Sequence, residues 1–203
     1  YVVAKEMMRI TEPVDITDAE NFDKELEKMG TDRGKADAIR TRLTRTISEK
    51  SKADPAYYKK FSKRIEETIE EYRNRRITDS EYLQKMQDIK EDFRKGNSGI
   101  SYPTNITTEN SRAFYGVIYD KLIPRMKENT NIEEIGEITL TIQREIESKI
   151  KRDWHYNTDI HNEIAQAIDD TIFMYATRKN ISLDLEELDK LIEEIINIAL
   201  MKY

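Results

Sequence analysis

The sequence contains no cysteine and few of the residues that interrupt a helix. Without cysteine, a disulfide framework, a zinc–thiolate site and a cysteine nucleophile are all excluded. Only 4 prolines and 6 glycines occur in 203 residues, which favours helices over a β-rich fold. No apolar run approaches the ~20 residues that a membrane-spanning helix needs, and no signal-peptide pattern opens the chain. These absences predict a cytoplasmic protein with no membrane partner.

Positive charge is also in deficit, because the formal net charge is -6. The chain as a whole is therefore not a basic nucleic-acid-binding protein. Residues 33–64 nevertheless carry an excess of Lys and Arg, while residues 184–203 are acidic. Within the basic stretch, Lys35, Arg42, Arg45 and Lys52 follow a helical spacing that puts them on one face. This face is a candidate for contact with DNA phosphates, and an ordinary solvated helix face is the alternative.

Apolar residues recur every three or four positions through most of the chain, which gives each predicted helix one apolar face. No sustained alternation of period two indicates a strand. Helix-start signals precede the apolar stripes: residues 17–20, 78–81 and 130–133 fit the capping box, Asp54 precedes Pro55, and Asn157 can cap the helix after it. Because the apolar faces have to pack on one another, the sequence predicts an all-α, multi-helix bundle.

One segment interrupts this helical pattern. Residues 96–106 combine Gly, Asn, Ser and Pro over a short span and predict a loop. The loop separates a basic helical segment, residues 1–95, from a C-terminal helical bundle, residues 107–203, so that the chain can form two helical subdomains. Pro124 disfavours helix at Ile123 and should end or kink the helix before it.

Two short patterns look like catalytic motifs, and neither fits. Residues 30–36 resemble a phosphate-binding loop, but three residues rather than four separate the glycines, and Ala36 lacks the hydroxyl that binds magnesium. A turn between two helices, with Gly30 as the C-cap, is the preferred interpretation. Glu147 and Lys149 match half of a metal-dependent nuclease motif, yet side chains two apart on a helix point to different faces. The sequence therefore predicts no catalytic residue, metal site or cofactor in this chain.

The only tryptophan and both histidines lie within residues 153–162. Trp154 is predicted to fill the corner between two helices, and contact with a partner through Trp154, His155 and Tyr156 is the alternative. His155 and His161 are six residues apart across a helix start, which does not predict a metal site.

Three sequence patches occur in order along the chain. They are Asp54-Pro-Ala-Tyr-Tyr-Lys-Lys-Phe-Ser62 with Arg76-Ile-Thr-Asp-Ser-Glu-Tyr-Leu83, then Arg112-Ala-Phe-Tyr-Gly-Val-Ile118, then Asp153-Trp-His-Tyr-Asn-Thr-Asp-Ile160 followed by an acidic helix ending in Ile198-Ala-Leu-Met-Lys-Tyr203. In this order and at these distances from the chain end, they resemble the C-terminal region of the motor (restriction) subunit of type I restriction enzymes. The resemblance covers about residues 36–203.

The resemblance implies a larger parent with an N-terminal nuclease domain, ATP-driven motor domains and a helical region at its end. With methylation and specificity subunits, such a parent is an ATP-dependent, site-specific endodeoxyribonuclease that translocates DNA. This chain then corresponds to the non-catalytic helical region that docks the motor subunit onto the methylation core. ATP, Mg and DNA are ligands of the parent, and no cofactor is expected in the chain itself. A free-standing helical scaffold or a DNA-contacting domain is the alternative.

Overall fold

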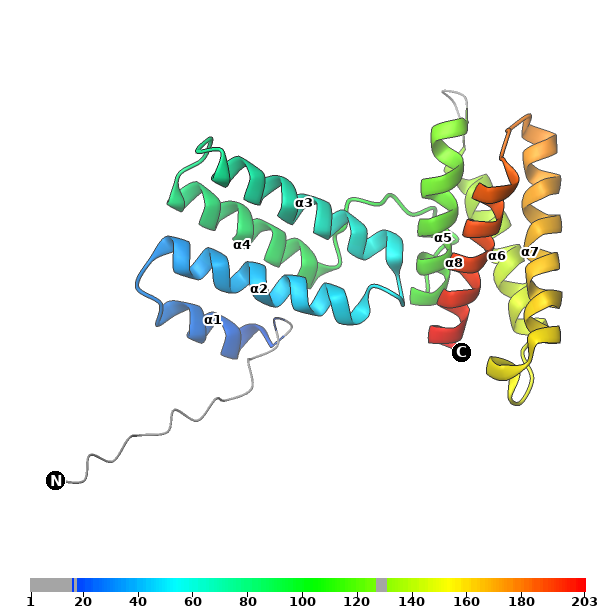
Figure 1. The fold of residues 1–203 in the computed structure, drawn as a ribbon, viewed down its shortest axis with the longest axis horizontal. Helices are drawn as coiled ribbons and strands as arrows, with labels where there is room; N and C mark the ends of the chain where they lie inside the picture. Colours follow the sequence, from blue (N-terminus) through cyan, green and yellow to red (C-terminus); the bar gives the residue numbers. More distant parts are fainter. Residues whose placement is uncertain (1–15, 17, 127–130) are drawn as a thin grey trace. The chain divides into compact units, whose positions relative to one another are not determined.

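The computed structural model describes residues 16, 18–126 and 131–203 (Figure 1). Over these residues the chain forms eight α-helices, two short 3-10 helices and no strand, which confirms the predicted all-α class. None of the helices described is long and apolar enough to cross a membrane. The helices are α1 (Ala19–Glu27), α2 (Asp32–Lys50), α3 (Pro55–Arg73), α4 (Asp79–Lys95), α5 (Glu109–Leu122), α6 (Ile132–Lys149), α7 (Thr158–Lys179) and α8 (Leu185–Lys202), with 3-10 turns at Ile123–Arg125 and Trp154–Tyr156.

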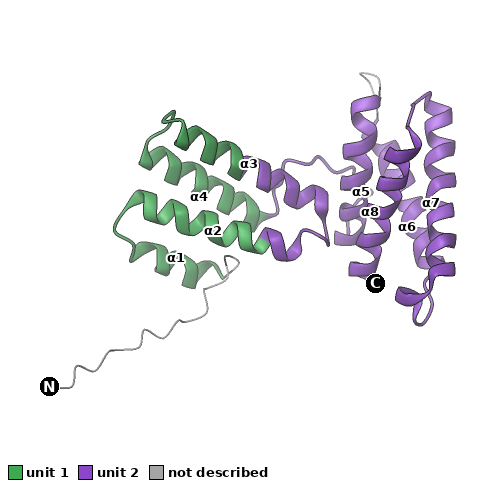
Figure 2. Ribbon diagram, in the orientation of Figure 1, with its two compact units in different colours: residues 1–46, 65–95 green, residues 47–64, 96–203 purple. Residues whose placement is uncertain are grey.

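The chain divides into two compact units (Figure 2). Unit 1 comprises residues 1–46 and 65–95, and unit 2 comprises residues 47–64 and 96–203. The connection between α4 and α5, residues 96–108, contains the predicted loop. The sequence placed all of residues 1–95 in one segment, whereas the compact units assign residues 47–64, the end of α2 and the start of α3, to unit 2.

Local signals in the sequence explain where several helices begin. The predicted capping box at Thr78 is confirmed: Thr78 N donates to Glu81 Oε2 at 2.7 Å, and Glu81 N donates to Thr78 Oγ1 at 3.3 Å. Asp54 caps α3 by accepting a hydrogen bond from Tyr57 N at 3.1 Å, and Asn157 caps α7. Such side-chain acceptors satisfy amide groups that the first helical turn leaves without partners.

Other predicted termini differ in the structure. Thr17 and Thr130 lie outside the described residues, and α1 and α6 are capped by the neighbouring Asp18 and Asn131. The prediction that Gly30 is a C-cap was wrong, because the C-cap of α1 is Lys28, which is right-handed, and Gly30 is not among the residues with positive φ. A cap of this kind needs a left-handed residue just after the helix.

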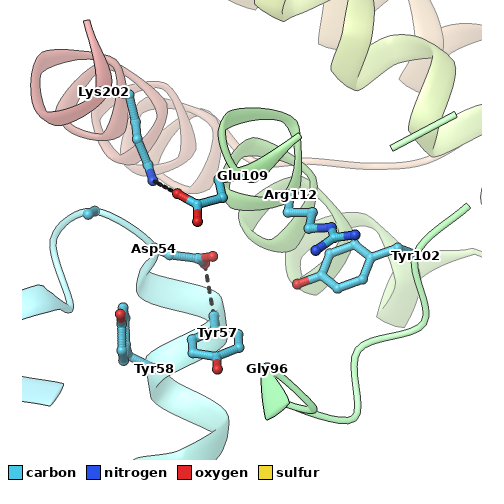
Figure 3. A pocket seen from close by; sticks show the side chains of 9 residues that line it. Asp54, Tyr57, Tyr58, Gly96, Tyr102, Glu109, Arg112 and Lys202 are labelled. Atoms are coloured by element: carbon cyan, nitrogen blue, oxygen red, sulfur yellow. Dashed lines mark hydrogen bonds and ion pairs between the residues drawn. The ribbon is translucent and has the colours of Figure 1, made fainter. Parts of the chain in front are cut away.

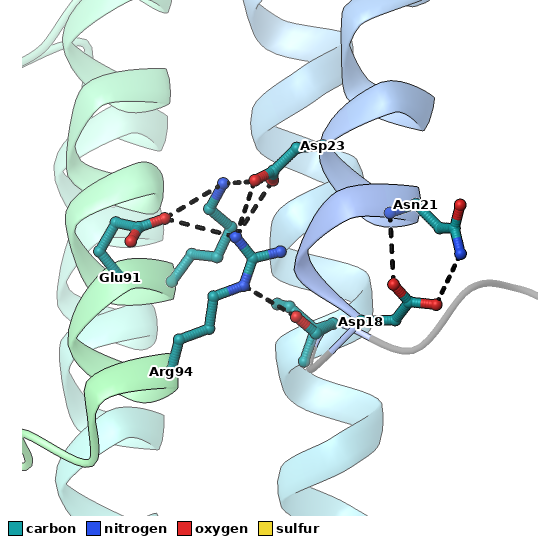
Figure 4. A network of polar contacts seen from close by, with 7 residues as sticks. Asp18, Asn21, Asp23, Glu91 and Arg94 are labelled. Carbon is teal, nitrogen blue, oxygen red and sulfur yellow. Dashed lines mark hydrogen bonds and ion pairs between the residues drawn. The ribbon is translucent and has the colours of Figure 1, made fainter.

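A partly buried polar network joins α1 and α4 within unit 1 (Figure 4). Lys90, only 6% exposed, donates to Asp23 Oδ1 at 2.7 Å, and Arg94 Nη1 donates to Asp23 Oδ2 at 2.9 Å. Arg94 Nε also donates to the backbone carbonyl of Ile16 at 2.9 Å. Burial alone raises the pKa of the Asp23 carboxyl, but its bonds and ion pairs with Arg94 and Lys90 outweigh that effect and leave the pKa below its usual value. The network therefore fastens α1 to α4 with charges that compensate one another.

Helices α5 to α8 form a four-helix bundle in unit 2. Helix α5 packs against α6 and α8, and α7 packs against the same two helices. The apolar faces predicted from the three- and four-residue spacing are buried in its core, including Phe114, Ile118, Ile142, Ile146, Ile164, Ile168, Ile172 and Ile195. Pro124 has the predicted effect, since α5 ends at Leu122 and the chain continues as a 3-10 turn.

Glycine permits two close approaches inside unit 2. A Cβ added at Gly116 of α5 would lie 2.7 Å from Ala56 Cβ at the start of α3. A Cβ at Gly136 of α6 would lie 2.8 Å from Pro103 Cγ and 2.5 Å from Asn105 Oδ1 in the loop before α5. These separations are too short for carbon contacts, so the absent side chains allow α3 and the loop to lie against the bundle.

Candidate functional site

The structure keeps three of the four basic residues of the predicted face on one helix and places the fourth outside it. Lys35, Arg42 and Arg45 lie on α2, whereas α2 ends at Lys50 and Lys52 lies in the following turn. Arg42 is engaged within unit 1: its side chain is 19% exposed and its Nη2 lies 3.5 Å from Glu25 Oε1. Arg45 and Lys52 are exposed, and Lys35 is half-buried. A single helical face of four residues is therefore not formed, and contact with DNA phosphates stays a prediction.

The two lookalikes of catalytic motifs have structural roles. Gly34 and Lys35 belong to α2, and Gly34 N donates to Thr31 Oγ1 at 3.1 Å at the start of that helix. Glu147 accepts a hydrogen bond from the Tyr203 hydroxyl at 2.6 Å, while Lys149 pairs with Glu145 at 2.8 Å. Over residues 16, 18–126 and 131–203, no three His, Asp or Glu side chains form a group that could hold a metal ion.

A pocket of about 240 Å³ lies in unit 2 at the start of α3, the loop before α5, the start of α5 and the end of α8 (Figure 3). Lys202 Nζ lies 4.0 Å from Glu109 Oε2, and the Arg112 guanidinium lies 5.4 Å from the centre of the Tyr102 ring. Lys202 therefore faces a carboxylate and Arg112 faces an aromatic ring. With two acidic and two basic side chains, the lining carries no net charge. It is formed by Ala53, Asp54, Tyr57, Tyr58, Gly96, Tyr102, Glu109, Arg112 and Lys202.

Burial raises the pKa of several titratable groups that line this pocket. Burial raises the pKa of the Asp54 carboxyl, which also caps α3. Burial likewise raises the pKa of Tyr57 to about 12, so its phenol keeps its proton near neutral pH and acts as a donor rather than a base.

The predicted corner residues have different environments. Trp154 is 2% exposed and belongs to the core of unit 2. Its ring centre lies 4.7 Å from that of His155 and 5.7 Å from that of His161. Asp153, with a left-handed φ of 65°, turns the chain before the 3-10 helix that holds Trp154. Tyr156, in contrast, is 92% exposed. The corner therefore buries the tryptophan and presents the tyrosine to solvent.

The described residues with large, exposed apolar side chains all lie after α6. Neither α7 nor α8 uses its whole surface in the bundle, and each leaves some of these side chains in solvent. These residues are Tyr156, Phe173, Met174, Leu185, Met201 and Tyr203. A contiguous apolar patch in solvent typically marks a contact surface, and within this set Phe173 and Met174 are adjacent on α7.

Phe173 and Met174 were absent from the sequence-predicted sites, although the sequence contains a signal for them. The buried face of α7 needs Ile168, Ile172 and Tyr175. The adjacent Phe173 and Met174 extend the apolar run beyond what one face can bury, and they are 65% and 66% exposed. A run of consecutive apolar residues that exceeds what one helix face can bury is thus the sequence feature that could have identified Phe173 and Met174.

Comparison with known families gives one match. A family model described as Type I restriction enzyme HindI endonuclease subunit-like, C-terminal, matches residues 6–199. No curated protein matches the sequence, and no solved structure matches the fold. The family match spans both compact units and agrees with the resemblance carried by the three sequence patches.

Proposed function

The chain belongs to the family of C-terminal regions of type I restriction enzyme HindI endonuclease subunit-like proteins, and on that premise we propose that it is a non-catalytic assembly region of a motor subunit. In this role it docks the parent onto a complex of methylation and specificity subunits. The parent is the ATP- and Mg-dependent DNA translocase and site-specific endonuclease, working in the cytoplasm. DNA is bound through the parent, with the basic residues of α2 as an additional candidate contact.

The observation that supports this role is the distribution of exposed apolar side chains. In the described part of the chain they occur only from Tyr156 onward, on the corner before α7 and on α7 and α8. Exposed apolar groups gain free energy when a partner removes them from water, and aromatic residues and Met are enriched in protein interfaces. Helices α7 and α8 are therefore the best candidates for the docking surface.

Truncation of the full-length parent tests the assembly role. A parent that ends near Lys95 lacks α5 to α8 and should lose stable association with the methylation subunit. Its basal ATP hydrolysis should persist, because the proposal assigns the motor and nuclease to other domains. Size-exclusion chromatography with light scattering measures assembly, and a coupled assay measures ATP hydrolysis. Normal assembly and restriction by the truncated parent would contradict the docking role.

A second expected result concerns chemistry in the isolated chain. Purified residues 1–203 should neither hydrolyse ATP nor cleave DNA in the presence of Mg, because Lys35 lies within α2 and Glu147 is engaged with Tyr203. The assays are phosphate release and conversion of supercoiled DNA. Turnover that disappears in Lys35→Ala or Glu147→Ala, and so is not contamination, would show that the region has a catalytic site of its own.

A further inference from the structure

One side of α7 combines negative charge with exposed apolar groups. We define the outer stripe of α7 as Asp159, Glu163, Asp170, Phe173 and Met174. Asp170 precedes Phe173 by three residues and Met174 by four, and such spacings place side chains on the same side of a helix. The buried residues of α7 follow a different register, Ile160, Ile164, Ile168 and Ile172. The outer stripe therefore faces away from the core of the bundle along most of the length of α7.

The negative charge of this stripe is not compensated by its surroundings. Helices α7 and α8 carry nine Asp and Glu against four Lys and Arg. The four cations already face other groups: Lys179 pairs with Glu134 at 2.6 Å, Lys190 with Glu186 at 2.5 Å, Lys202 lies 4.0 Å from Glu109, and Arg178 lies over the Tyr175 ring.

The stripe carboxylates, in contrast, have no cation close to them. Over the described residues, no Lys, Arg or His nitrogen lies within 4.0 Å of Asp159, Glu163 or Asp170. The helix dipole stabilises an acid in the first turn and fades beyond it. It therefore accounts for Asp159, but not for Asp170 in the middle of the helix.

Two exposed apolar residues lie at the C-terminal end of the same stripe. Phe173 and Met174 are both about two-thirds exposed, at 65% and 66%. A solvated helix face usually intersperses charges of both signs, whereas this stripe has one sign of charge and adjacent large apolar groups. Phe and Met are enriched in the centre of protein interfaces, and charged groups are typical of the rim.

We propose that the outer stripe of α7 docks a basic, amphipathic protein surface of the partner subunit. An apolar patch of that surface covers Phe173 and Met174, and Lys or Arg residues beside it face Asp170, Glu163 and Asp159. Nucleic acid does not fit this stripe, because its phosphates are repelled by the carboxylates. The inference rests on the proposed assembly role and specifies the chemistry of the partner.

A second copy of this chain fits the stripe less well than a separate partner. The basic stretch of the sequence lies in residues 33–64, but several of its cations are already paired. Arg42 pairs with Glu25 and Lys60 with Asp120 within their own units, and Arg40 lies 3.5 Å from Asp37. Each of these ion pairs would have to break before its cation could face an acidic stripe on another copy.

Two variants of the full-length parent test the inference. Phe173→Ser/Met174→Ser removes the apolar contact, and Asp170→Lys reverses the charge. Each should weaken association with the methylation subunit by about tenfold or more, because truncation of central interface contacts has effects of that size. The effect of Asp170→Lys should shrink as salt is raised, since salt screens charges at the protein surface. Unchanged melting temperatures should show that both variants fold.

The matched control lies on another helix of unit 2. Glu137→Lys reverses an exposed charge on α6 and should associate like wild type. If the stripe variants assemble normally while the Lys95 truncation does not, the assembly role stands and the stripe is not its docking surface. If the truncation also assembles, the assembly role itself fails. Self-association of residues 1–203 that is lost in the stripe variants would identify a second copy as the occupant and overturn the partner assignment.

Discussion

Trp154→Ala should lower the free energy of unfolding of unit 2 by about 3 kcal/mol, the lower end of the range for buried aromatic residues. The side chain is 2% exposed and packs in the core of the bundle, so alanine leaves a large cavity. Its indole Nε1 is buried without a hydrogen-bond partner in the described structure. Removing an unsatisfied donor recovers part of the loss, which is why the lower end is expected.

Thermal unfolding followed by circular dichroism measures this effect. A loss of about 3 kcal/mol corresponds to a fall of roughly 10 °C in Tm for a domain of this size. Tyr156→Ala is the matched control, because it removes a neighbouring aromatic ring that is 92% exposed and should change stability by no more than about 0.5 kcal/mol. A Trp154→Ala protein that melts within a degree or two of wild type would show that the corner does not depend on this side chain.

The second large effect is expected in unit 1, where Asp23→Ala should destabilise the protein by about 2 kcal/mol. The change leaves Lys90 and Arg94, with side chains 7% and 12% exposed, without the carboxylate that they share. Two facts keep the effect below that of a fully buried pair. Asp23 is itself 45% exposed, and Glu91 lies 3.5 Å from Lys90 and can replace part of the lost charge.

The contribution of Asp23 should also depend on pH, with a sign set by its lowered pKa. A carboxyl whose pKa is lower in the folded than in the unfolded state stabilises the fold above the unfolded pKa, about 3.9 for Asp. That contribution is lost as the pH falls through the folded-state pKa. The difference between wild type and Asp23→Ala in urea titrations should therefore be full at pH 6 and shrink below about pH 4. Glu20→Ala, which removes an exposed pair with Lys24, serves as the control for the loss of an acidic side chain on α1.

Features that depend on nearby residues could be predicted from the sequence. The all-α class follows from the spacing of apolar residues, and the caps at Asp54, Thr78 and Asn157 follow from side chains that bond to amides two or three residues away. These interactions depend only on neighbours in the chain. The end of α5 at Leu122, two residues before Pro124, also has a local cause, because a proline disfavours helix at the residue before it.

Features that depend on contacts between residues far apart in the chain could not be predicted from the sequence. Spacing on α2 suggested that Arg42 faces solvent with its neighbours, but Glu25, seventeen residues away, holds it. The pairing of Lys90 with Asp23 spans 67 residues, and no periodic pattern identifies which acid meets which base.

Gly116 and Gly136 have a practical consequence for stabilising this protein. Glycine inside a helix usually costs about 1 kcal/mol relative to alanine, so a consensus or propensity-based redesign would replace both residues. The 2.7 Å approach to Ala56 and the 2.8 Å approach to Pro103 reverse that advice, because the new methyl groups would force backbone or ring atoms apart. An engineer who wants a more heat-resistant variant should leave these two positions unchanged and improve helix-forming residues on exposed positions instead.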